Sequence, residues 1–255
     1  MKVRDHLIHT VSFGAGRPIV GISGSFGTWE IWQAPFELLS ATWRTIAYDH
    51  LGAGETHVPH ELVTFENQAK LAIDVIDAFE LDTCILAGDS SMTAVALEVA
   101  RRHPERIAAL VLVSGGVDYG PTDDVRRFVG GLRSAFEPTV EAFVRLCFPE
   151  PDTEHLQRWL RDIIGRTGGD RAATLVESFY EVDVRAILPE VPVPTLVVHG
   201  AHDAMPAMTL AAAEELAGTL PDAELLVLDD AGHVPTLSRP HDVAAAIDDF
   251  ARRRA

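Results

Sequence analysis

The alternation of short apolar runs with helix-like segments constrains the fold of this chain more than any other feature. The expected strands cover residues 19–22, 45–48, 84–87, 108–113, 195–200 and 225–228. One expected helix carries Phe65, Ala69, Ala72, Ile76 and Phe79, whose spacings of four and three residues place them on a single apolar face. Strands that alternate with helices are typical of a mainly parallel sheet with crossover helices. We therefore predict an α/β fold, with a mostly parallel sheet flanked by helices.

The alternation breaks between residues 117 and 188. This region contains amphipathic helical stretches, such as DDVRRFVGGLRSAF and TVEAFVRLCF, and no convincing strand. The alternation resumes at Pro194. A chain of 255 residues is long enough for one large α/β domain. We expect a single core made of residues 1–116 and 189–255, interrupted by a helical insertion at 117–188.

Charge and composition exclude several classes of protein. The chain has 38 acidic and 21 basic residues, and its formal net charge of −17 would repel the phosphates of nucleic acids. No apolar run approaches the ~18 residues of a membrane helix, and the N-terminal segment lacks the apolar stretch of ~7–15 residues found in secretory signals. Cys84 and Cys147 predict neither a disulfide nor a zinc site. We expect a cytoplasmic monomer or small homo-oligomer that acts on a small molecule, with no nucleic-acid or membrane partner.

A candidate nucleophile lies where the expected strand 84–87 meets the next helix. The strand runs into Gly88, Asp89 and Ser90, and a helix begins directly afterwards. A serine on such a tight turn has its hydroxyl exposed above the sheet, and the helix N-terminus stabilises a developing oxyanion. We predict that Ser90 is the nucleophile and that the backbone amide of Ser91 is an oxyanion donor. On this turn the side chain of Asp89 is expected to point away from the site.

A serine hydroxyl needs a base and an acid to become a strong nucleophile. Two segments supply candidates, and each follows an expected strand. TLVVHGAHDAMP places Asp203 in a loop, and LLVLDDAGHVPTLSRP places His233 in the next one. The order serine, aspartate, histidine is the order expected for this architecture. We therefore predict that His233 is the general base and that Asp203 orients it.

These segments together resemble the α/β-hydrolase superfamily, in its serine hydrolase branch with a helical cap. The matching stretches, in chain order, are PIVGISGSFGTWEIW, RTIAYDHLGAGET, the turn at residues 88–90, HPERIAALVLVSGG, VPTLVVHGAHD and AGHVPTLSRP. The resemblance implies the same roles for Ser90, Asp203 and His233, makes residues 117–188 a cap over the pocket, and implies no metal or organic cofactor. Some relatives take the acid from the loop after the preceding strand, which keeps Asp118 as an alternative.

Two positions depart from the family pattern. Met92 stands where Gly-x-Ser-x-Gly has its second glycine, so we expect a shifted helix or a Met92 side chain that contacts substrate in the pocket. The usual His-Gly after the first long strand is absent, and the loop SGSFGT resembles that of 3-oxoadipate enol-lactonases. The second oxyanion amide is that of Ser25 when counted back from Trp32, and that of Phe26 in the enol-lactonase-like register.

These residues favour a serine hydrolase that cleaves a carboxylic ester or lactone of a small, partly apolar molecule through an acyl-enzyme. The same three residues also support cleavage of a carbon–carbon bond, or cofactor-free perhydrolysis as in non-haem haloperoxidases. A third alternative is a ligand-binding protein without hydrolytic activity, because a fold does not fix a function.

Overall fold

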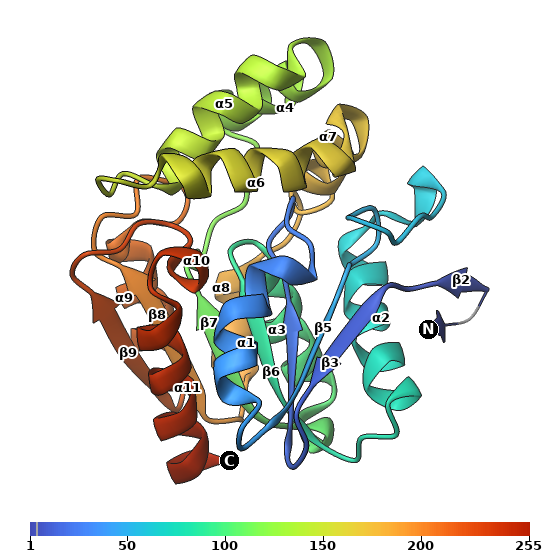
Figure 1. Cartoon of the computed structure of the whole chain (residues 1–255), viewed down its shortest axis with the longest axis vertical. Helices are drawn as coiled ribbons and strands as arrows, with labels where there is room; N and C mark the ends of the chain where they lie inside the picture. Colours follow the sequence, from blue (N-terminus) through green and yellow to red (C-terminus); the bar gives the residue numbers. More distant parts are fainter. Residues whose placement is uncertain (4) are drawn as a thin grey trace.

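A seven-stranded sheet forms the centre of the computed structural model, which describes residues 1–3 and 5–255 (Figure 1). The strand order is β3-β5-β4-β6-β7-β8-β9, and every neighbouring pair is parallel except β3 with β5. The predicted α/β fold is therefore confirmed. The strands are β3 (Thr10–Phe13), β4 (Pro18–Ile22), β5 (Arg44–Tyr48), β6 (Cys84–Asp89), β7 (Ile107–Val113), β8 (Thr195–Gly200) and β9 (Ala223–Leu228).

The N-terminal strands were not foreseen from the sequence. Strand β3 is an antiparallel edge strand, and β1 (Lys2–Val3) pairs with β2 (His6–Leu7) in a separate two-stranded sheet. The side chains of β3 are half-buried or exposed, so this segment carries no apolar run of the kind that marks the inner strands.

The two faces of the sheet bury alternate side chains in separate apolar cores. In β7, Leu110 and Leu112 belong to one core, whereas Ala109, Val111 and Val113 belong to the other. The first core is covered by α2 (Phe65–Ala78), α3 (Met92–Arg102), α8 (Val184–Ile187) and α9 (Leu210–Thr219). The second core is covered by α1 (Gln33–Leu39) and α11 (Pro240–Arg254), which lie together in Figure 1. A sheet covered on both faces explains why the inner strands are continuously apolar.

Helices between β7 and β8 form a further layer beyond the ends of the strands (Figure 1). We call it the α4–α7 layer; it comprises α4 (Asp123–Ser134), α5 (Phe136–Cys147), α6 (Glu154–Thr167) and α7 (Gly169–Glu177). The layer has its own apolar cluster, which also includes Phe26, Ile31 and Val234 from the core. The α4–α7 layer therefore packs on the loops that follow β4 and β9. In the part of the chain that the structure describes, no helix combines the length and the apolar character that crossing a membrane requires.

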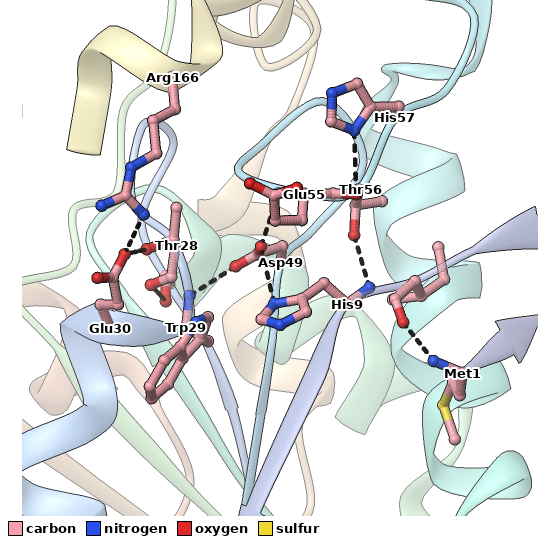
Figure 2. A network of polar contacts seen from close by, with 12 residues as sticks. Met1, His9, Thr28, Trp29, Glu30, Asp49, Glu55, Thr56, His57 and Arg166 are labelled. Atoms are coloured by element: carbon pink, nitrogen blue, oxygen red, sulfur yellow. Dashed lines mark hydrogen bonds and ion pairs between the residues drawn. The ribbon is translucent and has the colours of Figure 1, made fainter. Parts of the chain in front are cut away.

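A buried carboxylate joins three loops near the end of β5 (Figure 2). The side chain of Asp49 is 2% exposed and accepts hydrogen bonds from the backbone N–H groups of Trp29 (2.8 Å) and Glu55 (2.9 Å). The Nδ1 atom of His9 lies 3.2 Å from its Oδ2 atom. Since Trp29 ends the loop that follows β4, Asp49 helps to hold that loop in place.

The same loop is also bound to the α4–α7 layer (Figure 2). Arg166 of α6 donates to the Glu30 carboxylate (2.6 Å), and that carboxylate accepts from the Thr28 hydroxyl (2.7 Å). The loop after β4 is thus held from the core side by Asp49 and from the other side by Arg166.

Replacing Asp49 with alanine should destabilise the fold. Two backbone N–H groups would lose their acceptor beside a buried side chain, at a cost of about 1–3 kcal/mol each. We expect the free energy of unfolding to fall by about 2–6 kcal/mol in urea denaturation. Asp77→Ala is the control, because Asp77 is 57% exposed and pairs only with Arg106 among its recorded contacts. It should cost at most about 1 kcal/mol. Equal losses in the two variants would contradict the role given to Asp49.

Candidate active site

A tight turn between β6 and α3 places the candidate nucleophile. Ser90 has a φ of 55°, in the left-handed region that residues other than glycine rarely adopt. Its N–H donates to the carbonyl of Val113 (2.8 Å), and its own carbonyl accepts from Thr93 (3.1 Å). A side chain at Gly88 would approach the carbonyl oxygen of Met92 to 2.8 Å, so the turn requires glycine there. The strained backbone at Ser90 is held by hydrogen bonds and by close packing of strand and helix.

The three residues expected to form a catalytic triad meet at one edge of the sheet. Ser90 Oγ lies 2.9 Å from His233 Nε2, and His233 Nδ1 lies 2.7 Å from Asp203 Oδ2. They come from the loops after β6, β9 and β8, whose carboxyl ends share this edge. The alternative acid, Asp118, is 66% exposed and lies 3.7 Å from Arg185. Asp203, not Asp118, is the carboxylate that contacts His233.

The charges around His233 suit it to act as a base. Burial would lower the pKa of His233, but the Asp203 carboxylate, through its charge and its hydrogen bond, and the charge of Asp89 together raise it above 6.5. A second histidine, His199 of β8, has its Nε2 atom 3.5 Å from Asp203 Oδ2. Burial lowers the pKa of His199, which favours the neutral form of this ring. Asp203 thus lies between two imidazoles, one of which faces Ser90.

The position of Asp89 corrects the expectation that it points away from the site. Its carboxylate accepts a hydrogen bond from the backbone N–H of Gly24 (3.3 Å), and the residue lines the cavity described below. The reason is that β6 extends through Asp89, and the loop after β4 crosses directly over its end. Burial raises the pKa of Asp89 to about 7, although His233 and the Gly24 hydrogen bond act in the opposite direction. One feature of the sequence indicated that Asp89 could lie at the site: this carboxylate directly precedes the candidate nucleophile, Ser90.

Several backbone N–H groups around Ser90 are available to bind an oxyanion. A Cβ atom at Gly24 would lie 2.9 Å from Ser90 Cβ, so the loop after β4 passes directly beside the candidate nucleophile. The hydroxyl of Ser25 is hydrogen-bonded to that of Ser91. Among the contacts of the described residues, none uses the N–H of Ser25, Phe26 or Ser91. Ser25 and Phe26 both line the cavity, so both remain candidates for the second oxyanion amide.

Met92 does not take the position expected for it. The side chain is fully buried in the core that α2 and α3 share with the sheet, and it is absent from the cavity wall. The reason is that α3 begins at Met92 and packs this side chain into the apolar core that the helix shares with the sheet. The expectation of a substrate contact at Met92 was therefore wrong. Met208, from the loop after β8, lies at the site instead, with its Sδ atom 3.4 Å from Ser90 Oγ.

A cavity of about 540 Å³ opens above Ser90 and His233. Its size is within the range of roughly 300–1,000 Å³ that is usual for ligand sites. Much of its wall comes from the α4–α7 layer, through Val125, Phe128, Phe143, Leu146, Leu160, Ile164 and Val176. In the described part of the chain, no group of three histidine, cysteine or acidic side chains is placed to hold a metal ion.

The α4–α7 layer also holds the loop that carries His233. The backbone N–H of His233 donates to the carbonyl of Cys147 (3.0 Å), at the end of α5. The Glu150 carboxylate accepts from the N–H of Gly232 (2.6 Å) and from the hydroxyl of Ser238 (3.0 Å). Local sequence patterns contained no sign of Glu150, because its partners lie more than eighty residues away along the chain.

Comparisons with known proteins agree with this geometry. The sequence profile described as alpha/beta hydrolase fold matches residues 17–240. A pimeloyl-[acyl-carrier protein] methyl ester esterase from Aromatoleum aromaticum is 34% identical over 189 residues, which cover 67% of this chain and 75% of that protein.

Two solved structures have the same fold. The esterase EaEST from Exiguobacterium antarcticum superimposes with a TM-score of 0.91 at 19% identity, covering 97% of this chain and 96% of that one. The enol-lactonase from Burkholderia xenovorans LB400 has a TM-score of 0.90 at 22% identity, with 98% of each chain covered. With the profile matching most of its length, this chain belongs to the α/β-hydrolase family, and it is a hydrolase.

Proposed function

We propose that this protein is a serine hydrolase that cleaves a carboxylic ester or lactone of a small, partly apolar molecule through an acyl-enzyme on Ser90. The observation that carries the proposal is the continuous contact from Ser90 Oγ to His233 Nε2 (2.9 Å) and from His233 Nδ1 to Asp203 Oδ2 (2.7 Å). This contact lies at the base of a cavity large enough for a small molecule. Relatives that include an esterase are consistent with this chemistry.

In the first half of the reaction, His233 accepts the proton of Ser90 as Oγ attacks the substrate carbonyl. The negative charge on the carbonyl oxygen is stabilised by the N–H of Ser91 and by that of Ser25 or Phe26. The imidazolium of His233 then protonates the leaving alkoxide, and the carbon–oxygen bond breaks. Asp203 stabilises the cationic imidazole and holds it in the required orientation.

In the second half, His233 removes a proton from water, and the resulting nucleophile attacks the acyl carbonyl. The tetrahedral intermediate collapses, His233 returns the proton to Ser90 Oγ, and the acid is released. The α4–α7 layer acts as the cap in this proposal, because it walls the cavity and keeps bulk water from the acyl group.

A fluorophosphonate probe should label Ser90. We expect one adduct, located by peptide mass mapping, that is lost in Ser90→Ala and forms about 10²–10⁴-fold more slowly in His233→Ala, because the base is gone. Ser114→Ala is a matched control, because Ser114 is also buried, also has a positive φ (51°) and follows the neighbouring strand β7. It should be labelled like the wild type. If a folded wild-type protein is not labelled and leaves small esters intact, a ligand-binding role replaces this proposal.

The pH dependence of kcat/KM should report on His233. The base must be neutral to accept a proton, and its pKa is raised, so activity should be lost on acidification with an apparent pKa above 6.5. Asp89→Asn removes a negative charge that contributes to the raised pKa, so the acid limb should move to lower pH. Asp82→Asn is the control, since it removes the same charge from an exposed position before β6, at the opposite end of that strand. An unchanged acid limb in Asp89→Asn would exclude the proposed coupling.

A further inference from the structure

The cavity above Ser90 has an unusual set of charges. The acidic and basic side chains among the described residues of its wall are Asp89, Asp118, Asp124 and His233. No lysine or arginine is among the described residues that line the cavity. His233 is committed to Asp203 and Ser90, so it offers no fixed positive charge to a ligand. The wall therefore contains carboxylates but no cation free to pair with an anionic ligand.

Two arginines that neighbour the carboxylates of the wall are paired with them. Arg185 lies 3.7 Å from Asp118 and also binds Glu215 (2.5 Å). Arg127 is hydrogen-bonded to Asp124. Neither arginine lines the cavity. The two carboxylates at the mouth thus hold the nearby guanidinium groups outside it.

Apolar side chains, many of them from the α4–α7 layer, make up much of the rest of the wall. Phe128 and Phe143 stack with ring centroids 5.5 Å apart, and Phe26 packs against both at 5.9 and 5.2 Å. Leu160 and Ile164 of α6 extend this surface. A carboxylate that entered this space would lose its water without gaining a cation, which is costly in free energy. An uncharged apolar group would lose nothing of this kind and would bury its surface favourably.

We infer that the substrate is an uncharged, apolar ester or lactone, and that the site excludes esters and lactones whose acyl group carries a carboxylate. This inference rests on the proposed hydrolase function and adds the substrate class to it. The charges of the cavity also differ from what the resemblance of one loop would suggest. The loop at residues 23–28 resembles that of 3-oxoadipate enol-lactonases, yet the cavity lacks the cation that a substrate derived from a dicarboxylic acid would need.

The test compares two p-nitrophenyl esters of similar shape. The neutral ester is p-nitrophenyl 6-methylheptanoate, and the anionic ester is mono-p-nitrophenyl adipate, in which a carboxylate replaces the terminal isopropyl group. We expect kcat/KM at pH 7.5 to favour the neutral ester by at least ~100-fold, because an unpaired buried carboxylate is strongly disfavoured. A ratio of tenfold or more supports the inference. A ratio below tenfold overturns it while the hydrolase function stands.

A gain-of-function variant makes the test independent of damage to the fold. Leu146 of α5 lines the cavity and is 42% exposed, so Leu146→Arg would place a cation at the mouth. We expect this variant to hydrolyse the adipate ester at least ~5-fold faster than the wild type. Leu38→Arg is the matched control, because Leu38 is also helical and 42% exposed but does not line the cavity. An equal gain in both variants, or no gain in Leu146→Arg, overturns the inference.

Failure of the proposed function has a different signature. If the wild-type protein cleaves neither ester and resists the fluorophosphonate probe, the hydrolytic role itself is wrong, and the inferred substrate class falls with it. Cleavage of both esters at similar rates leaves Ser90 as the nucleophile and removes only the selectivity.

Discussion

The close approach of three backbone segments around Ser90 is the constraint on which the rest of the site depends. Strand β6, the start of α3 and the loop after β4 come so near to one another that a side chain at Gly88 or Gly24 would lie within 3 Å of a neighbouring atom. This packing forces the positive φ of Ser90 and exposes its hydroxyl. It also places Ser25, Phe26 and Ser91 at the same cavity as that hydroxyl. The position of the candidate nucleophile and the candidate oxyanion donors therefore have a common structural cause.

The α4–α7 layer contributes to the site in more ways than by covering it. Arg166 holds the loop after β4 through Glu30, and Glu150 holds the loop after β9 through Gly232. The layer therefore contacts both the loop that carries the candidate oxyanion donors and the loop that carries His233. A change in the position of these helices would alter the size of the cavity and the placement of the reacting groups together.

Electrostatics divides the site into two parts. Around His233 the negative charges of Asp203 and Asp89 favour the protonated imidazole. His199 borders Asp203 on another side, and burial lowers the pKa of His199. In the cavity above, the wall carries the carboxylates of Asp118 and Asp124 together with aromatic rings. Acidic side chains thus lie both around the candidate base and along the cavity.

The sequence was enough to predict the parallel sheet, the strands that end at the site, and the candidate residues Ser90, Asp203 and His233. It could do so because apolar runs, turn residues and their order along the chain are local properties. The packed structure was needed to place Asp89 under the loop after β4 and Met92 in the core. It also brought Glu150 to Gly232. These placements depend on which helix face packs inward and which distant loops cross, and no local periodicity encodes either.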